Sequence, residues 1–140
     1  MTRRTKIAVL WLLTTCGFAY HTLCDMLPMF WGKDMAIMGT DGDVSQGIII
    51  FMMALSFLVP VCGIFCLMSR KRYLQIVNAI LALFVFLLNV AHAFMELPSD
   101  NAGQYIVMPT MILISFLLSR HSIECFKEER PRNLCKPFAC

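Results

Sequence analysis

The sequence predicts an all-α integral membrane protein built as a single four-helix bundle. Four apolar segments, each close to the roughly 20 residues that cross a bilayer core about 30 Å thick, take up most of the 140 residues. Hydrophobic residues make up 59% of the chain and charged residues only 15%, whereas a soluble domain carries about 25% charged residues. The predicted helices span residues 7–27, 47–68, 74–97 and 105–118. We therefore predict one transmembrane domain, residues 1–127, and a cytoplasmic tail, residues 128–140.

The basic residues gather at three places that an up-and-down bundle brings to one side of the membrane. They precede the first helix, connect the second helix to the third, and follow the fourth helix: Arg3, Arg4 and Lys6; Arg70, Lys71 and Arg72; Arg120, Lys127, Arg130, Arg132 and Lys136. The other two connections carry the acidic residues Asp34, Asp41 and Asp43 beside Lys33, and then Asp100. The positive-inside rule places both termini in the cytoplasm. The basic residues behind the net charge of +3 are explained by this orientation in the membrane. We therefore expect the lipid bilayer as a partner and no nucleic acid.

Local signals mark the limits of the helices. The first helix has a basic start, but no small-x-small cleavage site follows it, so we expect it to be retained and to end at Pro28. Pro60 in the second helix removes a backbone hydrogen bond and predicts a kink. Past Leu118, the spacing of Ile123 and Phe126 among charged residues predicts an amphipathic stretch that rests on the membrane surface.

The cysteines do not predict a disulfide framework. There are seven of them, an odd number, and most lie within helices or on the predicted cytoplasmic side, where thiols stay reduced. Only Cys24 approaches the outer side. Cys62 and Cys66 share a helix face at i, i+4 spacing, and we interpret them as small packing residues rather than metal ligands.

A short pattern occurs twice in the chain, at the outer ends of the first and third helices. The first copy reads His21-Thr-Leu-Cys-Asp25-Met-Leu-Pro28, and the second reads His92-Ala-Phe-Met-Glu96-Leu-Pro98. Each copy follows a basic start and an apolar run. Since the first and third helices point the same way, the pattern predicts a parallel two-plus-two internal repeat about an axis along the membrane normal.

These two copies form the candidate binding site. In each helix the histidine and the carboxylate are four residues apart, so they share one face. If the two helices adjoin, His21, Asp25, His92 and Glu96 converge in one outward-facing pocket, with Asn89 placed to orient His92. Two imidazoles and two carboxylates suit a divalent transition metal such as zinc, iron or manganese. A proton or organic-ligand site and a purely structural polar layer at the water boundary stay open as alternatives.

The leading functional prediction is a small binding or accessory protein with an outward-facing polar pocket. One alternative is a membrane metal-binding or redox protein that uses the two histidines and two carboxylates. Others are a small transporter, which would have to be oligomeric because four short helices enclose little volume, and a structural partner of a larger membrane complex. Phosphate-binding loops and nucleophile motifs do not occur in the sequence. Whether the protein is an enzyme is left open.

The chain resembles a group of small bacterial four-helix membrane proteins that are described only as a domain of unknown function, loosely related to DoxX-like proteins. The likeness rests on the segments 6–11, 25–28, 68–72 and 76–78, together with Gly32, and extends to about Lys127. The resemblance implies four membrane helices in the bacterial cytoplasmic membrane. It supplies neither an activity nor a set of site residues.

The predicted orientation is testable by cysteine labelling in a background where the native cysteines are replaced by serine. An impermeant maleimide added to intact cells should label Lys33→Cys and Asp100→Cys, because both acidic connections are predicted outside. Lys71→Cys should react only after the membrane is permeabilised. Labelling of Lys71→Cys in intact cells would overturn the whole arrangement.

Overall fold

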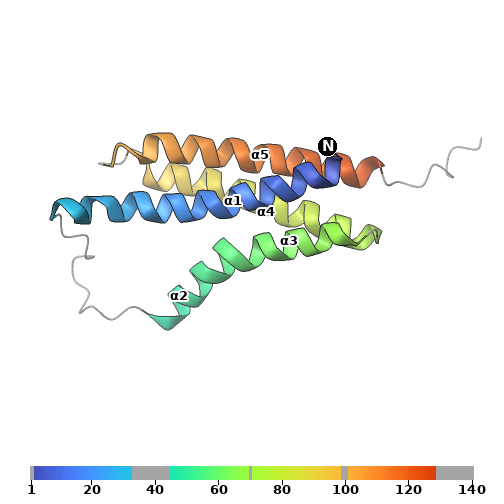
Figure 1. Ribbon diagram of the computed structural model, residues 1–140, viewed down its shortest axis with the longest axis horizontal. Coiled ribbons are helices and arrows are strands. Elements are labelled where there is room, and N and C mark those ends of the chain that lie inside the picture. Colours follow the sequence, from blue (N-terminus) through green and yellow to red (C-terminus); the bar gives the residue numbers. More distant parts are fainter. Residues whose placement is uncertain (1, 33–44, 70, 99–100, 129–140) are drawn as a thin grey trace, which may run out of the picture.

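The computed structural model describes residues 2–32, 45–69, 71–98 and 101–128, and these ranges are entirely helical apart from short connecting residues (Figure 1). The elements are α1 (Arg3–Met26), η1 (Leu27–Trp31), α2 (Gln46–Met53), η2 (Ala54–Leu58), α3 (Val59–Met68), α4 (Arg72–Glu96) and α5 (Gln104–Glu128). Because α2, η2 and α3 follow one another without a break, they form one span, and the described residues contain four helices long and apolar enough to cross a membrane. The predicted all-α class with four spans is confirmed. The acidic loop 33–44, Arg70, Asp100 and the predicted tail after Glu128 lie outside the described residues.

The four spans are arranged so that α1 and α4 lie on a diagonal. Each of them packs against both α3 and α5, whereas the backbones of α1 and α4 do not approach one another within the described ranges. One end of the bundle, called here the basic end, holds the starts of α1 and α4 and the ends of α3 and α5; the opposite end is called the site end (Figure 1). The first and third helices were expected to adjoin, but their backbones lie apart, and only their side chains meet across the diagonal.

The interior of the bundle combines apolar side chains with many polar and small ones, whereas its outer surface is largely apolar. The fully or nearly buried side chains of α4 and α5 follow heptad-like spacing, and many of them are amides or hydroxyls: Gln75, Asn78, Asn89, Gln104, Ser115, Ser119 and Ser122. Small and polar residues of this kind allow close approach and hydrogen bonding between membrane helices. The leucines and phenylalanines instead lie largely on the outside, where a bilayer would solvate them.

Trp11 occupies the centre of the basic half and is completely buried. Its indole nitrogen donates a hydrogen bond to Asn78 Oδ1 at 2.9 Å, and Asn78 Nδ2 donates to Ser122 Oγ at 3.0 Å. Gly63 of α3 lies directly against the indole, where a Cβ atom would overlap the ring. One aromatic side chain therefore connects α1 to α3 and α4, and through Asn78 to α5.

The second span bends where Pro60 was expected to disturb it. Immediately before the proline the chain forms the π-helical turn η2, in which the amide of Val59 donates to the carbonyl of Ala54. Beyond this turn α2 diverges from the rest of the bundle (Figure 1), and η2, which continues it, is the only described element that it contacts. The predicted kink is confirmed, and it opens a wedge between α2 and the helices α1 and α4.

The last helix differs from its prediction. The sequence pattern placed its end at Leu118 and a surface stretch beyond it, but α5 continues unbroken to Glu128. The extension stays in the bundle because its small residues are buried: Ser119 Oγ donates to the carbonyl of Ala82 at 2.8 Å, and Cys125 lies against Gln75. Arg3 forms ion pairs with Glu124 and Glu128. The five described cysteines are all free thiols, in agreement with the expectation from the sequence.

The contact between Gly63 and Trp11 predicts that Gly63→Ala destabilises the protein. Overpacking of this kind costs about 1–3 kcal/mol, whereas the better helix propensity of alanine offsets at most about 1 kcal/mol. We expect a lower midpoint of thermal unfolding in detergent. Gly47→Ala is the matched control, because its added methyl group would meet only Ser45 Oγ at 3.6 Å. A Gly63→Ala midpoint equal to or above that of the wild type would refute the packing described here.

Candidate functional site

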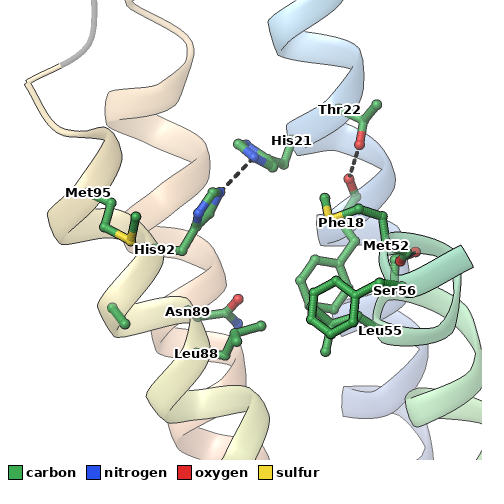
Figure 2. A pocket seen from close by; sticks show the side chains of 12 residues that line it. Phe18, His21, Thr22, Met52, Leu55, Ser56, Leu88, Asn89, His92 and Met95 are labelled. Carbon is green, nitrogen blue, oxygen red and sulfur yellow. Dashed lines mark hydrogen bonds between the residues drawn. The ribbon is translucent and has the colours of Figure 1, made fainter. Parts of the chain in front are cut away.

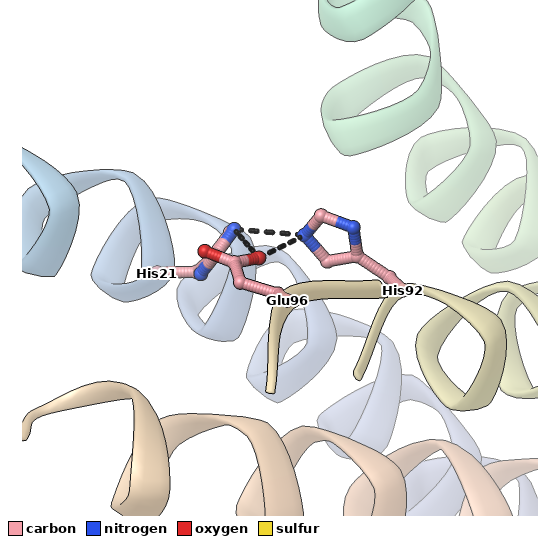
Figure 3. Close-up of side chains that lie close together, drawn as sticks. All are labelled: His21, His92 and Glu96. Carbon is pink, nitrogen blue, oxygen red and sulfur yellow. Dashed lines mark hydrogen bonds and ion pairs between the residues drawn. The ribbon is translucent and has the colours of Figure 1, made fainter. Parts of the chain in front are cut away.

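Three potential ligand atoms meet at the site end of the bundle (Figure 3). The Nε2 atoms of His21 on α1 and His92 on α4 are 3.0 Å apart. Glu96 Oε2 lies 2.9 Å from His92 Nε2 and 3.6 Å from His21 Nε2. The two imidazole rings stand edge to face, with their centroids 5.0 Å apart and an interplanar angle of 87°. The side chains thus bridge the diagonal that the backbones of α1 and α4 leave open.

The proton on His21 is fixed by a chain of hydrogen bonds that ends at Asp25. Gln104, the first residue of α5, donates through Nε2 to Asp25 Oδ1, which turns its Oε1 atom toward His21. That oxygen is an acceptor, so His21 Nδ1, 3.0 Å away, carries the proton. In the neutral imidazole, His21 Nε2 is then left with a lone pair directed at His92 and Glu96. The fully buried side chain of Gln104 holds this arrangement in place.

Asp25 and Asn89 lie beside this group rather than within it. Asp25 Oδ2 is 3.5 Å from His21 Nε2, but among the described residues the set whose ligand atoms all fall within 4.8 Å of one another comprises His21, His92 and Glu96. Asn89 is buried one turn from His92 on α4, and its Nδ2 atom has no hydrogen-bond partner. The expected role of Asn89 in orienting His92 therefore has no hydrogen bond to support it.

The site is reached from a cavity of about 270 Å³ that runs along one side of the histidines (Figure 2). Its polar part consists of His21, Asn89 and His92 together with the hydroxyls of Thr22 and Ser56, and the other lining residues are apolar ones of α1, α2, η2 and α4. The side chain of His92 is 44% exposed and that of Glu96 is 24% exposed, whereas His21 is only 14% exposed. His21 is thus held within the bundle, whereas the side chain of His92 faces the cavity.

The electrostatic surroundings of the site are negative. Asp25 and Glu96 lie in the last turns of α1 and α4, where the helix dipole already presents partial negative charge. The segments 18–32 and 89–108, which surround the histidines, contain no lysine or arginine. Two carboxylates and two helix C-termini therefore meet with no lysine or arginine from these segments, and the N-terminus of α5 at Gln104 supplies only a partial positive charge. The arrangement favours a cation or a proton on the histidines.

Gln104 is the site residue that the sequence pattern did not reveal. It stands alone among apolar residues at the start of a helix, outside the repeated histidine pattern. A signal was nevertheless present, because Gln104, Met108, Met111, Ser115 and Leu118 follow each other at intervals of four and three residues, and all of them are buried. Continuing this face backwards from the serines would have placed Gln104 inside the bundle.

Comparisons of the chain with models of protein families, with curated proteins and with solved structures find no match. The chemistry of this site must therefore be argued from its own geometry.

The hydrogen-bond chain predicts the tautomer of His21. With ¹⁵N-labelled histidine, NMR of the wild-type protein should show His21 protonated on Nδ1 and unprotonated on Nε2. Gln104→Leu removes the acceptor at similar volume, so the proton should redistribute toward Nε2. The signals of His121, which lies near the end of α5, provide the internal control. An unchanged His21 tautomer in the variant would contradict the assigned role of Gln104.

Proposed function

We propose that this protein is a membrane metal-binding protein that holds one divalent transition-metal ion per chain at the site end of the bundle. His21 Nε2, His92 Nε2 and Glu96 Oε2 would be the ligands. The observation that carries the proposal is their convergence, combined with the hydrogen bond from His21 Nδ1 to Gln104 Oε1. Histidines that bind metals generally donate their other ring N–H to an oxygen atom in this way, which fixes the tautomer and raises the basicity of the ligand.

The spacing of the three atoms fits a metal of this class. Zinc–ligand bonds of about 2.0–2.1 Å in a tetrahedral site separate neighbouring ligand atoms by about 3.3 Å. The observed separations of 2.9, 3.0 and 3.6 Å bracket this value. Two imidazoles and one carboxylate form the ligand set of catalytic zinc sites and of non-haem iron sites, and they leave at least one coordination position open for water, for Asp25 or for an exogenous ligand.

The negative charge of the two carboxylates favours a bound cation over a purely structural polar layer. Without a metal, Asp25 and Glu96 place two negative charges near each other at the ends of helices whose dipoles oppose them. A divalent cation neutralises both carboxylates at once. In the purely structural alternative, a protonated His21 or His92 would have to supply the opposing positive charge, because segments 18–32 and 89–108 contain no lysine or arginine.

We further propose that both termini are cytoplasmic and that the site faces the opposite side of the membrane. Basic residues at the basic end support this orientation, since Arg3 and Arg4 begin α1, Arg72 begins α4 and Lys127 lies in the last turn of α5. The resemblance to small bacterial four-helix proteins supports the bacterial cytoplasmic membrane as the location. The bound metal would then exchange with the extracytoplasmic space.

The arrangement of the helices supports a parallel two-plus-two repeat. A twofold axis along the bundle that exchanges the first two spans with the last two places α1 diagonally opposite α4, as observed. His21 and His92 are 71 positions apart, occupy corresponding places in the two halves, and their Nε2 atoms meet at 3.0 Å between α1 and α4 at the site end. The metal would therefore lie close to the axis, with one imidazole supplied by each half.

Metal binding is tested by titrating metal-free protein in detergent with Zn²⁺ and with Co²⁺, whose visible spectrum reports the coordination geometry. We expect one ion per chain. Replacing His21 or His92 with alanine removes a direct ligand, so each change should weaken binding by more than the roughly 10–100-fold typical of outer partners such as Gln104. Acidification should also weaken binding, because protonated imidazole cannot coordinate a metal.

Two further variants separate a ligand effect from a loss of structure. Glu96→Gln keeps the shape of the side chain but loses its charge, so it should weaken binding while leaving the thermal unfolding midpoint of the metal-free protein unchanged. His121→Ala removes a histidine on α5 that pairs with Glu124, and it should bind metal like the wild type. Unchanged metal content in the His21→Ala, His92→Ala double variant would refute the proposed function.

A further inference from the structure

The cavity beside the metal site has apolar walls along most of its length. Phe18 on α1, Phe51 on α2, Leu55 on η2 and Leu88 on α4 are among the residues that form them. Its imidazole and amide groups gather at one place, where His21 and His92 lie at the site end and Asn89 lies one turn deeper (Figure 2). The other polar lining residues, Thr22 and Ser56, donate their hydroxyl protons to backbone carbonyls one turn earlier in the chain. The shape therefore suits a molecule with an apolar body and a single polar group.

The cavity faces the bilayer because α2 diverges from the bundle. Every residue of α2 is exposed, and the backbone of α2 approaches no described element other than η2. The wedge between α2 and the helices α1 and α4 is thus open on its flank, within an apolar span. A ligand that enters by this route comes from the lipid phase rather than from water.

Asn89 indicates the chemistry of the polar group. Its side chain is 97% buried, since only 3% of it is exposed, and its Nδ2 atom has no hydrogen-bond partner. A buried donor without an acceptor is costly, and this one belongs to a residue that lines the cavity. The missing partner is an oxygen acceptor. In the metal-free protein Asp25 and Glu96 make the surroundings negative, so an uncharged carbonyl oxygen fits better than a carboxylate.

We propose that the cavity binds a neutral single-chain acyl lipid whose ester carbonyl accepts a hydrogen bond from Asn89 Nδ2. The acyl chain would lie between α2 and the helices α1 and α4. Asn89 and His92 are three residues apart, about 4.5 Å along the helix axis, so a carbonyl held by Asn89 would lie near the metal that His92 is proposed to bind. The inference deepens the proposed function and rests on it only for this last contact, because Asn89 and the apolar walls do not require the metal.

The experiment measures lipid binding by native mass spectrometry of protein released from detergent. The probes are monoolein and its ether analogue 1-O-oleylglycerol, which keeps the chain and the glycerol but lacks the carbonyl oxygen. We expect the wild type to bind monoolein at least tenfold more tightly than the ether, both with Zn²⁺ and after treatment with EDTA. Asn89→Leu should abolish this preference without loss of folding, because it removes an amide nitrogen that has no protein partner.

A matched pair of variants tests the location. Leu88→Trp fills the cavity and should reduce monoolein binding at least tenfold, whereas Leu87→Trp, at a neighbouring exposed position outside the cavity, should not change it. Equal binding of ester and ether by the wild type, retention of the preference in Asn89→Leu, or tighter binding of oleate than of monoolein would each overturn the proposal. Zinc binding without an ester preference would refute this inference alone, and an ester preference without zinc binding would refute only the metal function.

Discussion

The hydrogen-bonded packing of Trp11 is the constraint on which the rest of the bundle depends. The indole fills the centre of the basic half, rests against Gly63 and donates to Asn78 across the diagonal, so it sets the separation of α1 and α4. His21 lies ten residues further along α1, about 15 Å along a rigid helix. The distance imposed at Trp11 is therefore carried to the site end, where it leaves room for two imidazoles and one carboxylate between the helices.

This bundle buries many polar groups beside its apolar core and exposes much of its apolar surface, as the environment of a membrane allows. Lipid supplies no hydrogen bonds, so interior groups must satisfy one another and helix ends. At the basic end, Gln75 donates to the carbonyl of Ser69 and Arg4 donates to that of Leu67, which satisfies the end of α3. At the site end the same type of side chain, Gln104, instead serves to orient a histidine. The buried polar residues thus stabilise helix ends at the basic end and position the candidate ligands at the site end.

The parts of this fold that follow from single-helix properties could be predicted, and the parts that depend on pairing could not. Apolar length and the positions of the basic residues predicted four spans, and Pro60 predicted the bend. The continuation of α5 to Glu128 was missed because charged residues mask a buried face of small ones, Ser119, Ser122 and Cys125. At the site, the repeated pattern singled out the histidines and carboxylates, but the sequence alone does not show which residue of α5 faces them. The spacing along α5 could have placed Gln104 inside the bundle, but its hydrogen bond to His21 becomes evident only when α5 is set beside α1. The diagonal placement of α1 and α4 likewise depends on how whole helices pack.

The π-helical turn at Ala54–Leu58 makes the lining of the wedge depend on the number of residues in the second span. A π turn contains one residue more than the hydrogen-bonding pattern of an α-helix requires, so η2 shifts the register of every residue on its N-terminal side by about 100° around the helix axis. The direction in which α2 presents Phe51 is therefore set by a single surplus residue. A lineage that lost one residue from this turn would regain a continuous α-helix and turn a different set of side chains toward His21 and His92. The lining of the cavity can thus change by insertion or deletion as readily as by substitution.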